Sequence, residues 1–149
     1  MKIEILKENL KSGLSVVERV IGKNISLPIL DNVLISAEDT FLSLVSTDLE
    51  TAIKLWKLTK IVKKGSVVVP AKFLSSLVAS LPNEKIIIEA KGQDLFIECA
   101  SIKTQIKGFN PEDFPIIPTF NQDEFLEVDN KVFFEGLGQI INIASPSQS

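Results

Sequence analysis

Residues 6–30, LKENLKSGLSVVERVIGKNISLPIL, contain the clearest helical pattern in the chain. Apolar residues recur in this stretch at steps of four, four, three and four, which places them on one stripe of an α-helix: Leu6, Leu10, Leu14, Val17 and Ile21. The opposite face is polar and carries three cations. We expect Gly22 to end the helix, Pro28 to prevent helix after it, and the apolar run at 27–30 to return the chain to a core. The stretch therefore predicts an amphipathic helix over residues 7–21, followed by a basic turn.

Outward from this helix, the same order of elements is predicted twice. The first copy has a strand at 2–6, the helix, and strands at 33–38, 41–46 and 51–58. A basic connector at 60–65 leads to the second copy, which has a strand at 66–69, a helix with Pro70 in its first turn, and strands at 85–90, 94–99 and 102–109. The pattern predicts an α+β fold of duplicated β-α-β-β-β units, with two helices packed side by side on antiparallel sheets.

The last part of the chain looks like the start of a third copy. A loop with three prolines, at 110–120, is typical of a boundary. A strand is predicted at 124–128, and Asp129 is a good N-cap for an amphipathic helix over 129–143. The three following strands are missing. We therefore expect residues 1–122 to form one domain, residues 123–149 to begin another, and the chain to be the N-terminal fragment of a longer protein.

Composition argues against an enzyme. The 149 residues include no histidine, no tyrosine and one cysteine, Cys99. The commonest general base and the commonest metal ligand are therefore absent, and no carboxylate spacing typical of a metal site is present. We expect no cofactor and no metal. No apolar run is long enough to span a bilayer and no signal peptide is recognisable, so a cytoplasmic location is expected.

Charge is distributed unevenly along the chain. The net charge is −3, but residues 1–107 hold 15 basic against 12 acidic residues, whereas residues 108–149 hold one basic against seven acidic residues. A solvated surface with an acidic C-terminal part accounts for this. The alternative is a protein with one basic face.

Short motifs in order along the whole chain resemble the bacterial DNA sliding clamp, the β subunit of DNA polymerase III. They are the start MKIEILKENLKSGLSVVERVI, LPIL at 27–30 with NVL at 32–34, LSL at 42–44 with STDLE at 46–50, VPA at 69–71, and DFP at 113–115. The resemblance implies three copies of a two-helix, two-sheet domain per subunit. It also implies that two subunits close head to tail into a ring around duplex DNA.

The resemblance implies a non-catalytic DNA tether whose helices face the DNA and whose sheets form an outer wall with acidic residues. Binding to phosphates would be sequence-independent, salt-sensitive and individually weak. The candidate DNA-binding residues are Lys7, Lys11, Arg19, Lys23, Asn24, Lys72 and Gln148. Asn24 occupies the place of a basic residue in the family, so Lys23 is expected to replace it. For each cation taken singly, the alternative is an ordinary solvated surface residue.

The resemblance also implies a subunit interface at one edge of the first domain. The matching residues are Phe73, Leu77, Lys103 and Ile106. Leu77 and Ile106 could equally be core residues, and the helical stripe favours the core for Leu77. In the family, the pocket for polymerase and clamp-loader peptides lies between the second and third domains, so this chain lacks it.

Two other classes of function stay open from the residues alone. One is a protein-interaction module that uses an exposed sheet edge and does not bind DNA. The other is a hydrolase or transferase that relies on carboxylates, which the missing histidines disfavour. Salt-sensitive DNA binding would indicate the clamp. Absence of DNA binding would indicate the interaction module, and turnover of a substrate would indicate the enzyme.

Overall fold

The computed structural model describes residues 1–21, 27–118 and 126–141. It divides the chain into two compact units, Met1–Ile117 and Pro118–Ser149. We call them the first and second unit and describe each by itself. The division falls five residues before the predicted boundary at 122, and the assignment of residues 123–149 to a second clamp domain stays a prediction.

The first unit has the predicted α+β composition. Its strands are β1 (Lys2–Leu6), β2 (Asn32–Glu38), β3 (Phe41–Thr47), β4 (Ala52–Leu58), β5 (Lys60–Lys63), β6 (Gly65–Pro70), β7 (Lys85–Lys91), β8 (Asp94–Cys99) and β9 (Ile102–Lys107). Its helices are α1 (Lys7–Val17) and α2 (Ala71–Ser80), with 3-10 turns at Glu18–Val20, Pro28–Asp31 and Pro111–Asp113. The duplicated order of elements is confirmed.

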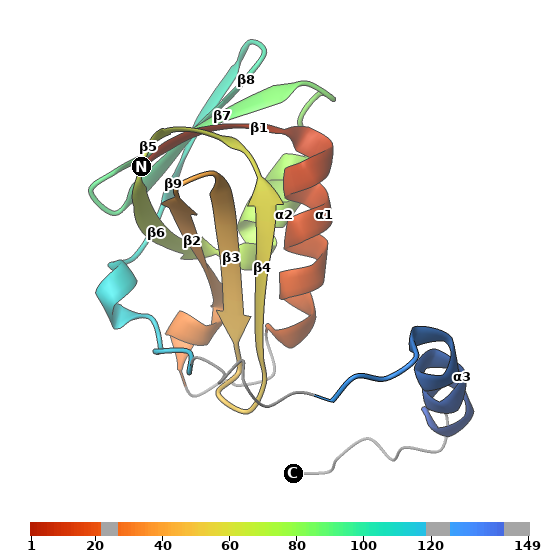
Figure 1. The fold of residues 1–149 in the computed structure, drawn as a ribbon. Helices are drawn as coiled ribbons and strands as arrows, with labels where there is room; N and C mark the ends of the chain where they lie inside the picture. Colours follow the sequence, from red (N-terminus) through yellow and green to blue (C-terminus); the bar gives the residue numbers. More distant parts are fainter. Residues whose placement is uncertain (22–26, 119–125, 142–149) are drawn as a thin grey trace. The chain divides into compact units, whose positions relative to one another are not determined.

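The two copies exchange their first strands. One sheet has five strands in the order β5-β1-β7-β8-β9, and the other has four in the order β4-β3-β2-β6 (Figure 1). Strand β1 therefore lies against the second copy, with Ile3 opposite Ile88, while β6 lies against the first copy, with Val69 opposite Val33. Every pairing is antiparallel. Exchanging the two copies maps the order β1-β7-β8-β9 onto β6-β2-β3-β4.

The connector after the first copy is also part of a sheet. The sequence predicts a basic connector at 60–65, but Lys60–Lys63 form strand β5, which pairs with the outer edge of β1. The second copy has a counterpart, since Phe109 forms a bridge with Val68 on β6. A Cβ atom on Gly108 would clash with the carbonyl oxygen of Val68, so only glycine fits this close approach.

One core lies between the two helices and both sheets. Helix α1 contributes Leu10, Leu14 and Val17, and α2 contributes Leu74 and Val78, all fully buried. Burying an aliphatic side chain of this size stabilises the fold by about 1.5–3 kcal/mol. Figure 1 shows α1 and α2 side by side along the sheets. The helix layer is therefore held in place by the core that the sequence pattern predicts.

The boundaries of the helices differ from the prediction. The α-helix ends at Val17 and continues as a 3-10 turn, Glu18–Val20, so Gly22 does not end it. The hydroxyl of Ser46 donates a buried hydrogen bond of 2.7 Å to the carbonyl of Val17, the last residue of the α-helix. Leu6 ends β1 and is 58% exposed, so it is not part of the buried stripe.

Pro28 and Pro70 occupy different positions in their elements from those predicted. Pro28 is expected to prevent helix, but it begins a 3-10 turn, Pro28–Asp31, because proline suits the first position of a helical turn. Pro70 is the last residue of β6, opposite Asn32, and α2 begins one residue later.

The described part of the second unit contains helix α3 (Asn130–Ile140). The Asp129 carboxylate accepts a hydrogen bond of 3.0 Å from the amide of Val132, which confirms the predicted N-cap. Residues 126–128 are not in a strand, and the rest of the predicted strand 124–128 lies outside the described residues. Across the described ranges, no helix is long and apolar enough to cross a membrane.

Candidate nucleic-acid interface

The exposed sides of α1 and α2 form one surface, because their other sides are buried on the sheets. Lys11 on α1, Arg19 in the 3-10 turn and Lys72 in the first turn of α2 are exposed there. The structure thus brings three of the predicted DNA-binding residues together on the helix layer. We call this exposed side of α1, the 3-10 turn and α2 the helical surface.

Lys7 has a structural role that the sequence did not indicate. Its ammonium group donates a hydrogen bond to the carbonyl oxygen of Leu81, at the C-terminal end of α2. A cation is favoured at this position, because the last carbonyls of a helix carry partial negative charge. The hydrogen bond also shows that α1 and α2 run antiparallel, since the first residue of one meets the end of the other.

Three predicted DNA-binding residues cannot be placed. Lys23, Asn24 and Gln148 lie outside the described residues. Their roles, including the replacement of the family's basic residue at Asn24 by Lys23, stay predictions.

The ion pairs between described residues lie on the sheets and their turns, and none of them joins a cation of the helical surface. They are Lys2–Glu89, Lys60–Glu4, Lys64–Asp39, Lys85–Glu4, Lys91–Glu89 and Lys103–Glu98. Within the described ranges, Lys11, Arg19 and Lys72 have no carboxylate partner. Their charge is therefore available to an external anion.

The sheets carry many lysines as well as the acids that the resemblance implies. Glu4 on β1 accepts from Lys60 on β5 and Lys85 on β7, both at 3.2 Å. These hydrogen bonds, from Lys60 first and then Lys85, hold the pKa of Glu4 below its ordinary value. A hydrogen bond from Lys64 likewise lowers the pKa of Asp39. Many strand lysines thus neutralise acids of their own sheet.

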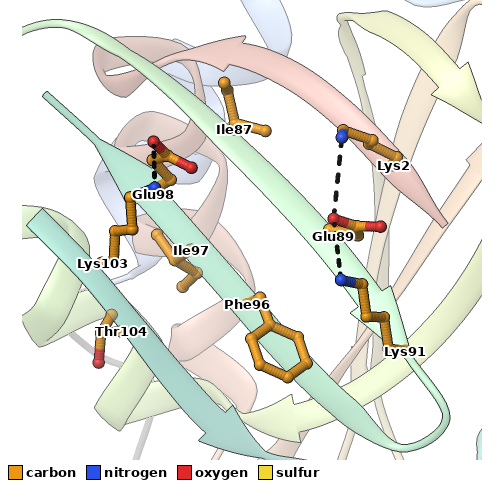
Figure 2. A pocket seen from close by; sticks show the side chains of 9 residues that line it. All are labelled: Lys2, Ile87, Glu89, Lys91, Phe96, Ile97, Glu98, Lys103 and Thr104. Atoms are coloured by element: carbon orange, nitrogen blue, oxygen red, sulfur yellow. Dashed lines mark ion pairs between the residues drawn. The ribbon is translucent and has the colours of Figure 1, made fainter.

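The outer face of the five-stranded sheet has a groove lined by such pairs. Figure 2 shows Glu89 between Lys2 and Lys91, at 3.8 and 3.6 Å. Lys91 also lies 5.4 Å from the ring centroid of Phe96. Across the groove, Lys103 on β9 pairs with Glu98 at 3.1 Å. The groove is almost balanced in charge, so it offers less to an anion than the helical surface does.

The predicted subunit-interface residues differ in accessibility. Phe73 on α2 is 57% exposed, and Lys103 lies on β9, an edge strand. Leu77 is partly buried and packs against the core, whereas Ile106 is 3% exposed and belongs to the core itself. The preference for a core position thus applies more strongly to Ile106 than to Leu77. Phe73 and Lys103 are the members of this set that a partner could reach.

Known proteins resemble this chain in sequence and in fold. The family model described as DNA polymerase III beta subunit, N-terminal domain, matches residues 1–118. The beta sliding clamp of Synechococcus elongatus is 29% identical over 92% of this chain and 37% of its own length, and that of Synechocystis is 30% identical over 100% and 40%. The crystal structure of DNA polymerase III subunit beta from Pseudomonas aeruginosa superposes with a TM-score of 0.76 and 30% identity, over 80% of this chain and 33% of that one.

The chain thus spans less than half the length of these relatives. The family match covers the whole first unit and agrees with its duplicated, strand-exchanged fold. The chain belongs to the DNA polymerase III beta subunit family, whose N-terminal domain it contains.

Proposed function

We propose that this chain is part of a sliding clamp, a ring that encircles duplex DNA and tethers the polymerase during replication. The observation that carries the proposal is the helical surface: two packed helices that present Lys11, Arg19 and Lys72 without carboxylate partners among the described residues. In this role the protein is a non-catalytic processivity factor in the cytoplasm.

The chemistry of the helical surface supports sequence-independent binding to DNA. Residues 7–21 and 71–80 hold four cations against two acids. Much of the remaining surface is small and polar, with Ser12, Ser15 and Ser80 donating their hydroxyl protons to helix carbonyls. Cations that meet phosphates without reading bases bind weakly and depend on salt. A surface of this kind lets DNA move past it.

The rest of the assembly is proposed from family membership. A ring requires head-to-tail pairing of two subunits, and the first unit offers β9 as an edge strand with Lys103 on it and Phe73 exposed on α2. Polymerase and clamp loader would bind through the second and third domains of the family. These 149 residues span less than half the length of their relatives, so ring closure and processivity are proposed for the full-length assembly.

DNA binding by the helical surface can be tested on the chain itself. A fluorescent duplex of arbitrary sequence is titrated at several low salt concentrations, and binding is followed by anisotropy. The double variant Lys11→Gln/Lys72→Gln should bind more weakly and reduce the slope of log affinity against log salt by about 0.9 for each phosphate that is no longer neutralised. A second duplex of different sequence should give the same slope.

The matched control is Lys91→Gln/Lys107→Gln, which removes two exposed lysines from the five-stranded sheet. It has the same net charge as the test variant, so general electrostatic attraction is equal in both. Equal reductions of the slope in both variants would contradict a DNA-facing helical surface. No salt-sensitive binding by the unaltered chain would favour the sheet-edge interaction module.

A further inference from the structure

Strand β4 presents lysines on both of its faces. It is an edge strand of the four-stranded sheet, and it lies next to α1 (Figure 1). Because side chains alternate along a strand, Lys57 shares a face with the core-packed Leu55, whereas Lys54 shares the opposite face with Trp56. Trp56 is 58% exposed, and the Lys54 ammonium lies 5.5 Å from its ring centroid.

Lys57 reaches helix α1. A Cβ atom on Gly13 would lie 3.4 Å from Cε of Lys57, the carbon that bears the ammonium group. The aliphatic stem therefore lies against α1 where glycine leaves room, and the charged group is held at the flank of the helix. Lys57 is half-buried, and among the described residues it forms neither an ion pair nor a side-chain hydrogen bond.

The packing of its stem on α1 restricts where Lys57 can present its charge. Holding a long side chain against a helix costs conformational entropy, and the stem gains only part of the packing that an aliphatic residue would make. Lys60 and Lys64, on the same stretch, are instead paired with Glu4 and Asp39. The ammonium group of Lys57 has no such partner in the described part of the chain and is directed to the helix layer.

We infer that Lys57 is a phosphate-binding residue of the helical surface, supplied by a strand and not by a helix. The inference rests on the proposed function. It widens the cationic surface from the exposed side of α1 to the flank that faces β4, so that a DNA backbone passing over α1 meets cations from two elements. Its ligand is the backbone phosphate of duplex DNA, without preference for sequence.

The first test removes the charge and keeps the stem. In the same anisotropy titration, Lys57→Met should lower the affinity and reduce the salt slope by about 0.9, the value for one neutralised phosphate. Lys54→Met is the matched control, since it removes the same charge three residues away on the opposite face, and it should leave the slope unchanged. Far-ultraviolet circular dichroism checks that both variants fold.

The outcomes separate the inference from the function on which it rests. If Lys57→Met and Lys54→Met behave alike while Lys11→Gln/Lys72→Gln still reduces the slope, the inference is wrong and the helical surface stands. If the unaltered chain fails to bind, or no helical variant changes the slope, both are overturned.

The second test measures proximity without relying on charge. The chain's single cysteine, Cys99, is 1% exposed, so a thiol-reactive photo-cross-linker should label an introduced cysteine selectively. Labelled Lys57→Cys should cross-link to the duplex on irradiation, and labelled Lys54→Cys should not. Cross-linking from position 54 alone, or equally from both positions, would overturn the inference.

Discussion

Helices α2 and α3 have similar apolar spacing but opposite surroundings. In α2, Leu74 and Val78 are fully buried between the sheets. In α3, Phe133, Leu137 and Ile140 have the same helical periodicity, yet all three are exposed within the second unit. Periodicity therefore specifies a helix and its apolar face, whereas burial requires a sheet to cover that face.

Replacing one leucine in each helix should give the largest difference in stability between α2 and α3. Leu74→Ala should reduce the free energy of unfolding by about 2–5 kcal/mol, because it leaves a cavity in a closed core. Leu137→Ala should change it by less than about 0.5 kcal/mol, the range for exposed positions. Urea unfolding followed by circular dichroism measures both. Comparable reductions would mean that α3 is as well packed as α2.

Glycines inside helices offer a second contrast, between α1 and α3. A Cβ on Gly13 would lie 2.8 Å from Cδ1 of the buried Leu44, whereas none of the described atoms lies within 4 Å of a Cβ on Gly136. Gly136→Ala should stabilise α3 by about 1 kcal/mol through helix propensity. Gly13→Ala has the same gain but incurs overpacking of about 1–3 kcal/mol, so it should destabilise the first unit by roughly 1 kcal/mol.

The measurement is the helical signal of α3 for Gly136→Ala and the unfolding midpoint of the first unit for Gly13→Ala. If Gly13→Ala raised the unfolding midpoint of the first unit, the side chain of Leu44 would have to move aside at no cost in free energy. That result would contradict close packing of α1 on the sheet.

Helix ends give a third contrast. Ser46→Ala removes the buried hydrogen bond to the Val17 carbonyl and should lower the global free energy of unfolding by about 1 kcal/mol. Asp129→Ala removes the N-cap of α3 and should cost that helix about 1 kcal/mol, seen as reduced helicity with no shift of the main transition. A shift of the main transition by Asp129→Ala would show that α3 unfolds together with the first unit.

Acid should weaken the first unit slightly through Glu4. Because the pKa of Glu4 is lowered in the folded state, its contribution is present above the ordinary value of 4.5 and is lost as the pH falls through the lowered value. Between about pH 6 and pH 3, the melting temperature of Glu4→Gln should therefore fall less than that of the unaltered chain. The effect is small, since exposed ion pairs contribute little.

Glu127→Gln is the control for this pH experiment. No ion pair joins Glu127 to another residue in the described ranges. The melting temperature of the Glu127→Gln variant should therefore change with pH as that of the unaltered chain does. If Glu4→Gln retained the full acid dependence, the bridge from β1 to β5 and β7 would not be responsible for it.

Local patterns predicted much of this fold because they depend on neighbouring residues. The buried stripe of α1 and the alternation of the strands both follow from a fixed spacing, and both were found. The exchange of β1 and β6 between the copies could not be predicted, because strand pairing is a non-local choice that alternation does not encode. Strand β5 was missed for the same reason, since a basic stretch becomes a strand only when an edge such as that of β1 is free.

Residue roles were predicted less well than elements. Exposure of Lys11, Arg19 and Lys72 follows from helical periodicity and could be predicted. The hydrogen bond of Lys7 to the end of α2 depends on how two helices pack, which no spacing within one helix reveals. Ile106 was assigned to an interface by resemblance, yet the alternation of β9 places it in the core.

The strand exchange also sets an order of events during synthesis. Ile3 and Ile5 leave the ribosome more than 80 residues before their partners on β7, Ile88 and Ile86. Strand β1 therefore stays apolar and unpaired with β7 while the whole first copy is synthesised. Pairing between residues so far apart in sequence slows folding and prolongs the exposure of aggregation-prone apolar segments. We expect the nascent first copy to be the stage at which this protein depends most on chaperones.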